Sequence, residues 1–201
     1  VLRSGDERNE DGLFHGYSTG EAAAIVVEQL RAMGLTTDFA PIITIVGHGS
    51  SSLNNPHEAA HDCGATGGGR GGHNARAFAA IANDVAVREE VRKRGSDLSE
   101  GVWFVGAYHN TCDDSMEYYD LDMVPEQFAG DIKRLKFWFE EACLRDAHER
   151  CRRFEDAPLN LSKDQAKIIA EKHSLDLAQP RPEYGHATNA ICYIGRRRKT
   201  Q

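Results

Sequence analysis

A chain of 201 residues with 40% hydrophobic and 27% charged residues has the composition of a folded domain, which excludes a disordered segment. The 24 basic and 31 acidic residues give a formal net charge of −7, which argues against a nucleic-acid-binding protein. No apolar run approaches the roughly 18 residues that span a bilayer, and five scattered cysteines are too few for a secreted disulfide framework, which favours a reducing compartment. We therefore expect one α/β unit over residues 1–201, and because the chain starts at Val1 we expect it to be a piece of a longer protein.

The first part of the chain predicts a helix, a strand and a long loop. Ser18-Thr19-Gly20-Glu21 has the spacing of a capping box and opens a helix that Gly34 ends. The apolar stretch from Phe39 to Val46 predicts a strand that is buried on both faces. It ends in Gly47-His48-Gly49-Ser50, and residues 48–72 are rich in glycine, asparagine and serine. A loop this long inside a compact domain is usually functional.

The middle of the chain predicts two helices and a second strand. Asn74 is expected to cap a helix, and a second helical segment runs from Asp84 to Gly95. Val102 to Tyr108 is an apolar strand candidate, and the polar segment His109 to Asp114 follows it.

Two further helices are predicted after that strand. Pro125 suits the first turn of a long helix that runs to about Phe154, and Ser162 opens another helix. The alternation of strand, helix and strand favours an α/β fold with parallel strands.

His48 and Cys63 are the strongest candidate metal ligands, because imidazole and thiolate are preferred ligands of zinc. His48 lies just past the end of a predicted buried strand, and ligands of open α/β sheets bind at that carboxyl edge. Cys63 lies in a glycine-rich segment, which can bring its sulfur over the strand end. The alternative is a hydrogen-bonded loop histidine and a buried, unreactive cysteine.

A competing zinc signature overlaps the same segment. His57-Glu58-Ala59-Ala60-His61 matches H-E-x-x-H, in which His57 and His61 hold zinc and Glu58 is the general base of a metallopeptidase. The glycines from Gly64 onward end such a helix after about two turns, and no third ligand follows at a suitable spacing. Cys63 as a nucleophile with His48 as its base is a further alternative, but no third group is identified to orient the histidine.

Longer motifs resemble those of the DabA family, and the resemblance covers most of the chain. The matching segments are Gly47 to Glu58, Asp62 to Ala65, Gly68 to Gly72, Asn74 to Ala79, His109 to Thr111 and Pro182 to Ala190. This family is the peripheral, carbonic-anhydrase-like subunit of a two-part bacterial inorganic carbon transporter. The resemblance implies a β-carbonic-anhydrase-like, mostly parallel sheet flanked by helices, incomplete here because the chain corresponds to a later portion of the family's longer proteins.

The resemblance also implies that this chain carries the second half of a zinc site. His48 in Gly-His-Gly and Cys63 in Asp-Cys-Gly match the family's ligands in the second half. The first half is a Cys-x-Asp-x-Arg segment on an earlier strand, so the Asp–Arg pair is expected upstream of Val1 and no catalytic residue is assigned here. Cys112-Asp113-Asp114 is no substitute, because Met116 stands where arginine is required.

The implied reaction is the hydration of carbon dioxide to bicarbonate, since zinc lowers the pKa of a bound water to roughly 7. The family implies coupling to an ion gradient through the membrane subunit DabB, and a peripheral location on the cytoplasmic side of the inner membrane. With two ligands identified, the isolated chain is expected to bind zinc weakly and to be inactive.

A polar motif near the end of the chain has two interpretations. Glu183, Tyr184, His186 and Asn189 precede the apolar run from Ala190 to Ile194. The motif lines the site or a partner contact, or it is a turn at the entry of a strand whose polar groups satisfy buried backbone.

Overall fold

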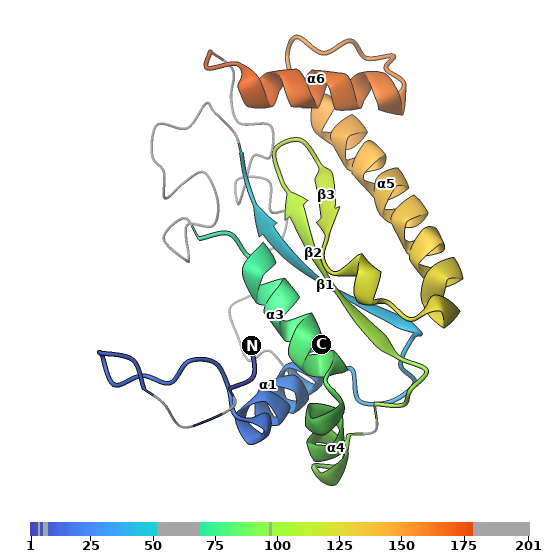
Figure 1. Cartoon of the computed structure of the whole chain (residues 1–201). Coiled ribbons are helices and arrows are strands. Elements are labelled where there is room, and N and C mark those ends of the chain that lie inside the picture. Colours follow the sequence, from blue (N-terminus) through green and yellow to red (C-terminus); the bar gives the residue numbers. More distant parts are fainter. Residues whose placement is uncertain (4, 6–7, 52–68, 97, 179–201) are drawn as a thin grey trace, which may run out of the picture.

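A computed structural model describes residues 1–3, 5, 8–51, 69–96 and 98–178, and it places three strands in one sheet in the order β1-β2-β3 (Figure 1). The elements in chain order are α1 (Thr19–Ala32), β1 (Ile42–Gly49), α3 (Gly72–Asn83), α4 (Val85–Lys93), β2 (Trp103–Asn110), β3 (Ser115–Tyr118), η2 (Leu121–Met123), η3 (Glu126–Phe128), α5 (Ala129–Cys151) and α6 (Lys163–Leu175). The expected α/β class is therefore present.

The sheet is mixed. β1 and β2 run parallel, with Ile42 opposite Trp103 and Gly49 opposite Asn110. α3 and α4 form the crossover that a parallel pair requires. β3 instead runs antiparallel to β2, because the turn of residues 111–114 is too short for a parallel connection. The prediction of parallel strands is right for β1 and β2, and the third strand was not expected.

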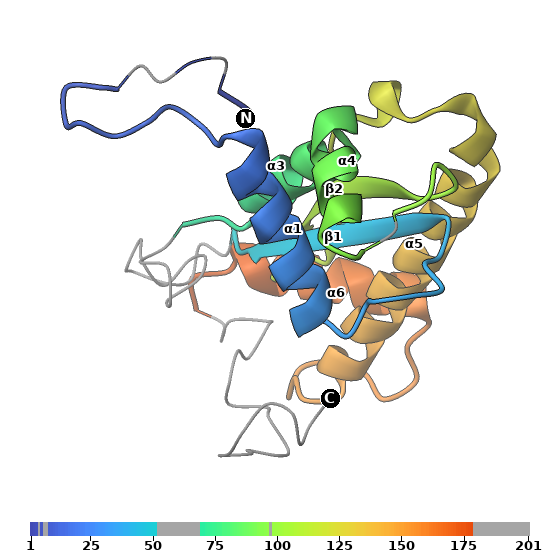
Figure 2. The same cartoon turned by 90° about the horizontal axis from the view of Figure 1, so that it is seen from below.

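The helices lie on two sides of this sheet (Figures 1 and 2). α1, α3 and α4 cover one side, and Ile43 and Ile45 of β1 pack against the core that these helices form. α5 lies on the other side next to β3, and α6 crosses the end of α5. A second, smaller core between these two helices contains Ala147, Cys151, Phe154, Ala166 and Ala170. Across the described part of the chain, no helix is both long and apolar enough to cross a membrane.

Local side-chain caps begin three of the helices. Ser18 and Glu21 form the predicted capping box of α1, in which the Ser18 amide donates to the Glu21 carboxylate at 2.8 Å. Asp84 caps α4 by accepting a hydrogen bond from the amide of Val87 at 3.0 Å. Ser162 begins α6 with a second capping box. The predicted starts of these three helices are confirmed.

Two predicted helix boundaries differ from the structure. Asn74 does not cap α3, whose N-cap is Gly71, three residues earlier, without a side-chain cap. The Gly71 amide donates instead to the His48 carbonyl at 2.8 Å, and this contact with β1 decides where α3 starts. The long helix predicted from Pro125 is present as η3 followed by α5, which ends at Cys151.

The prediction that β1 is buried on both faces is wrong. Val46 is 41% exposed, and the residues from Ile42 to Ile45 are only partly buried. Within the described part of the chain β1 pairs with one strand, β2, so it is an edge strand of this sheet. The apolar run therefore predicted the position of the strand, but it did not show which of its faces are buried by other elements.

Candidate functional site

β1 ends in Gly47-His48-Gly49, so His48 lies inside the strand and not just past its end. Its side chain is exposed. A Cβ atom on Gly47 would lie 2.1 Å from the carbonyl carbon of Gly71, so only glycine lets the returning chain approach β1 this closely. Gly71 is therefore held against β1, where its amide donates a hydrogen bond to the His48 carbonyl.

Hydrogen bonds hold the ends of β1 and β2 together. The Gly49 carbonyl accepts from the Thr111 amide at 2.8 Å and from the Thr111 hydroxyl at 3.0 Å. The Ser51 amide donates to Oδ1 of Asn110 at 3.1 Å, and Nδ2 of Asn110 donates to the Ser51 hydroxyl at 2.7 Å. The buried Cys112 thiol lies 3.2 Å from the same Oδ1. The carboxyl edge of the parallel pair is therefore a rigid, polar part of the fold.

A buried ion pair lies behind this edge. Arg150 of α5 pairs with Asp114, whose side chain is 1% exposed, and it also donates to the Thr111 carbonyl at 2.9 Å. The other Asp114 oxygen, Oδ1, lies 3.0 Å from Nε2 of His109. His109 is the strand neighbour of His48, in register across the parallel pair. His48 and His109 are therefore neighbours at the carboxyl edge of the sheet, and the His109 ring contacts the buried carboxylate of Asp114.

Asp146 adds a second carboxylate to this cluster. Its Oδ2 atom lies 3.4 Å from Nε of Arg150, so two carboxylates share one guanidinium group. The pKa of Asp146 is raised, first because partial burial disfavours its charged form and then because of the nearby Asp114 charge. Asp114 and Asp146 therefore lie on two sides of the single guanidinium group of Arg150.

The structure describes one of the two predicted metal ligands. Cys63 lies outside the described residues, as do the peptidase residues His57, Glu58 and His61 and the motif residues Glu183, Tyr184, His186 and Asn189. Over the described ranges, no group of three or more His, Cys, Asp or Glu side chains is arranged to hold a metal ion. The ligand pair His48 and Cys63 therefore stays a prediction.

The remaining cysteines that the structure describes are buried. Cys112, Cys143 and Cys151 are free thiols, as expected for small buried side chains. Burial is the main reason that the pKa of Cys143 is raised to about 11. Asp114, which follows Cys112 in the Cys-x-Asp order, is occupied by Arg150 and His109, so the structure gives no reason to treat this segment as a second zinc-binding motif.

Two residues at or behind the carboxyl edge were not predicted as site residues from the sequence. His109 was noted as the start of a polar segment and as part of a family-like motif, but it was given no role, although a histidine at the end of a second parallel strand is a usable signal. Arg150 has no comparable signal, because it lies 36 residues from Asp114 along the chain.

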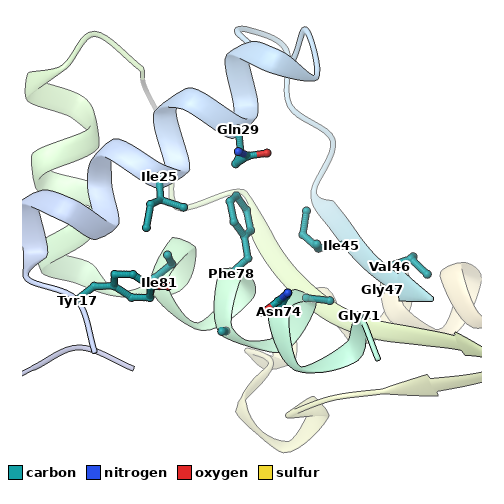
Figure 3. A pocket seen from close by; sticks show the side chains of 12 residues that line it. Tyr17, Ile25, Gln29, Ile45, Val46, Gly47, Gly71, Asn74, Phe78 and Ile81 are labelled. Atoms are coloured by element: carbon teal, nitrogen blue, oxygen red, sulfur yellow. The ribbon is translucent and has the colours of Figure 1, made fainter. Parts of the chain in front are cut away.

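A separate groove between α1, α3 and β1 has a volume of about 450 Å³ (Figure 3). Its lining is mainly apolar and includes Ile25, Ile45, Phe78 and Ile81. Its polar side chains are those of Tyr17, Gln29 and Asn74. The groove therefore offers an apolar shape, and no nucleophilic or metal-ligating side chain is among the described residues that line it.

The family model described as "Probable inorganic carbon transporter subunit DabA" matches residues 2–201. A protein of that name from Rhodopirellula baltica is 51% identical over 195 residues, which are 97% of this chain and 18% of that protein. One from Nitrosococcus oceani is 45% identical over 201 residues, which are 100% of this chain and again 18% of the relative. The chain thus spans about a fifth of the length of these relatives. No solved structure matches it.

Proposed function

Because the chain belongs to the DabA family, we propose that it is part of an inorganic carbon transporter subunit and contributes ligands to a zinc site that hydrates carbon dioxide to bicarbonate. The names of its relatives support the transport role. The observation that carries the site is the position of His48, exposed at the carboxyl edge of a parallel strand pair.

His48 and Cys63 are the zinc ligands in this proposal. The donor types fit zinc, since one is an imidazole and the other a thiol. The segment between Ser51 and Gly69 carries Cys63, and its two ends are bonded to the strand ends around His48. This anchoring supports the assignment of His48 and Cys63 to one site.

Bound zinc would supply a hydroxide at neutral pH. The residues of this chain would hold and orient the zinc ligands. β2 and Gly71 fix the backbone of His48, and the hydrogen bonds between Ser51 and Asn110 fix the start of the segment that carries Cys63. A family-like Cys-x-Asp-x-Arg segment elsewhere in the longer protein would supply the remaining ligands and complete a β-carbonic-anhydrase-like sheet.

The longer protein would work with a membrane partner. We assign this role to DabB, which would couple hydration to an ion gradient with the DabA subunit docked on the cytoplasmic side of the inner membrane. A net charge of −7 favours a protein partner over anionic lipid as the anchor of this chain.

Substitutions in the full-length protein test the site. Cys63→Ala and His48→Ala should each remove zinc and abolish carbon-dioxide-dependent growth support, because each removes a ligand. His61→Ala should do neither, whereas a metallopeptidase of the H-E-x-x-H type would lose its metal in that variant. Metal analysis of the purified variants provides the measurement, and a zinc-replete Cys63→Ala protein would overturn the assignment.

A further inference from the structure

Arg150 of α5 lies behind the strand end that carries His48, and its contacts lead toward that residue. We propose that Arg150 is a positioning residue for His48, an inference that rests on the proposed zinc site. α5 passes beside β3, and Arg150, close to the C-terminal end of this helix, reaches the turn between β2 and β3 (Figure 1). Its side chain is only 8% exposed, so the contacts of its guanidinium group are shielded from solvent.

Two hydrogen-bonded steps connect this guanidinium group to β1. Nη1 of Arg150 donates to the Thr111 carbonyl at 2.9 Å and to the Cys112 carbonyl at 3.4 Å. The amide and the hydroxyl of Thr111 both donate to the Gly49 carbonyl, at 2.8 and 3.0 Å. Gly49 directly follows His48 in β1. A displacement of Thr111 would therefore move the end of the strand from which the His48 side chain leaves.

The turn that Arg150 holds has a conformation that needs support. Asp114 has a φ of 56°, which lies in the left-handed region that favours glycine. A residue other than glycine stays in this region only where its surroundings fix it, and such residues cluster at functional sites. The Asp114 carboxylate is 1% exposed and pairs with Nη2 of Arg150. The ion pair therefore holds the turn, and with it the Thr111 carbonyl, in one arrangement.

Zinc affinity of the full-length protein, measured by competition with a chelator, tests the proposal. Arg150→Met combined with Asp114→Asn removes both charges of the buried pair, a change that proteins often tolerate, and it also removes the hydrogen bond to Thr111. Contacts that orient metal ligands typically contribute about 10–100-fold to metal affinity, and we expect a fall of about 10-fold because Arg150 acts through Thr111. Arg145→Ala is the matched control on the same helix, with a 72% exposed side chain, and should keep the parent affinity.

A second variant carries the same test with less change to the fold. Arg150→Lys keeps a positive charge next to Asp114, but lysine lacks the planar fork that binds the carboxylate and the Thr111 carbonyl together. Its zinc affinity should lie between those of the parent and the double variant. Thermal melts establish that each variant is folded before titration. Parent-like affinity in both folded variants would overturn the proposal.

Cobalt substitution gives a readout that a loss of stability alone would not move. The visible absorption of bound Co²⁺ depends on how its ligands are arranged, so the double variant should show a changed spectrum and Arg145→Ala the parent spectrum. A purely structural role of Arg150 predicts a lower melting temperature with an unchanged spectrum in the folded protein. That result would also overturn the proposal.

Failure of this inference is distinguishable from failure of the proposed zinc site. If His48→Ala removes zinc but the folded Arg150 variants keep the parent affinity and spectrum, His48 is a ligand that Arg150 does not position. If His48→Ala leaves zinc binding unchanged, the zinc site of the proposed function fails, and this inference fails with it.

Discussion

The described residues contain two histidine–aspartate pairs with opposite arrangements. In His109–Asp114, at the strand ends, the histidine side chain is 28% exposed and the aspartate 1%. In His173–Asp156, which joins α6 to the segment after α5, the histidine is 5% exposed and the aspartate 55%. The His173 ring also stacks on Phe154, with centroids 4.0 Å apart and planes 8° from parallel.

The difference shows what each pair is suited to do. A buried carboxylate with an accessible imidazole presents a ring nitrogen in a fixed orientation, which is the arrangement of a ligand or a catalytic group. A buried, stacked imidazole with an exposed carboxylate contributes packing, and its ion pair is weakened by solvent. The same two residue types therefore leave the imidazole accessible at the sheet edge and bury it between helices at the second site.

Removing Arg150 should have the largest effect on stability. Arg150→Ala leaves the Asp114 carboxylate buried without its cation, and breaking a buried pair from one side costs about 3–5 kcal/mol. Denaturant unfolding measures this loss. Arg145→Ala, on the same helix but with a 72% exposed side chain, should stay within about 0.5 kcal/mol of the parent. A loss below about 1 kcal/mol for Arg150→Ala would show that Asp114 does not depend on this support.

Gly47→Ala should have an intermediate effect. The new methyl group would lie 2.1 Å from the Gly71 backbone, and relieving such a clash costs about 1–3 kcal/mol. Zinc affinity should fall as well, because the returning segment is displaced from His48. Gly130→Ala is the matched control, since no atom lies within 4 Å of its added Cβ and alanine favours the helix. Equal stabilities of the two variants in thermal melts would contradict the close approach of Gly47 and Gly71.

Asp156→Asn should have the smallest effect. Its carboxylate is 55% exposed, and exposed pairs contribute about 0–1 kcal/mol. Asp114→Asn provides the comparison, because it leaves the buried Arg150 without its main counter-charge and should cost several times more. Urea unfolding of both variants measures the loss in free energy of unfolding. Similar losses would contradict the different contributions of the two pairs to stability.

Sequence patterns located most of the elements. Both predicted strands and the predicted helices are present, and the positions of Ser18, Asp84 and Ser162 were correct because a cap depends on atoms two or three residues away. The antiparallel β3 was missed, since its four residues carry too little pattern to stand out. The burial of β1 was overestimated because apolar content alone does not say which faces are covered.

The sequence by itself determined that a histidine between two glycines lies at the end of a strand, because an apolar run followed by glycines is a local signal. Only the tertiary structure decided that His48 and His109 are neighbours, since this depends on the register of two strands joined by a long crossover. The same holds for Arg150, which reaches Asp114 from a different helix. Caps and turns depend on hydrogen bonds between residues a few positions apart, so a short stretch of sequence predicts them. Contacts between distant segments depend on how the whole chain packs.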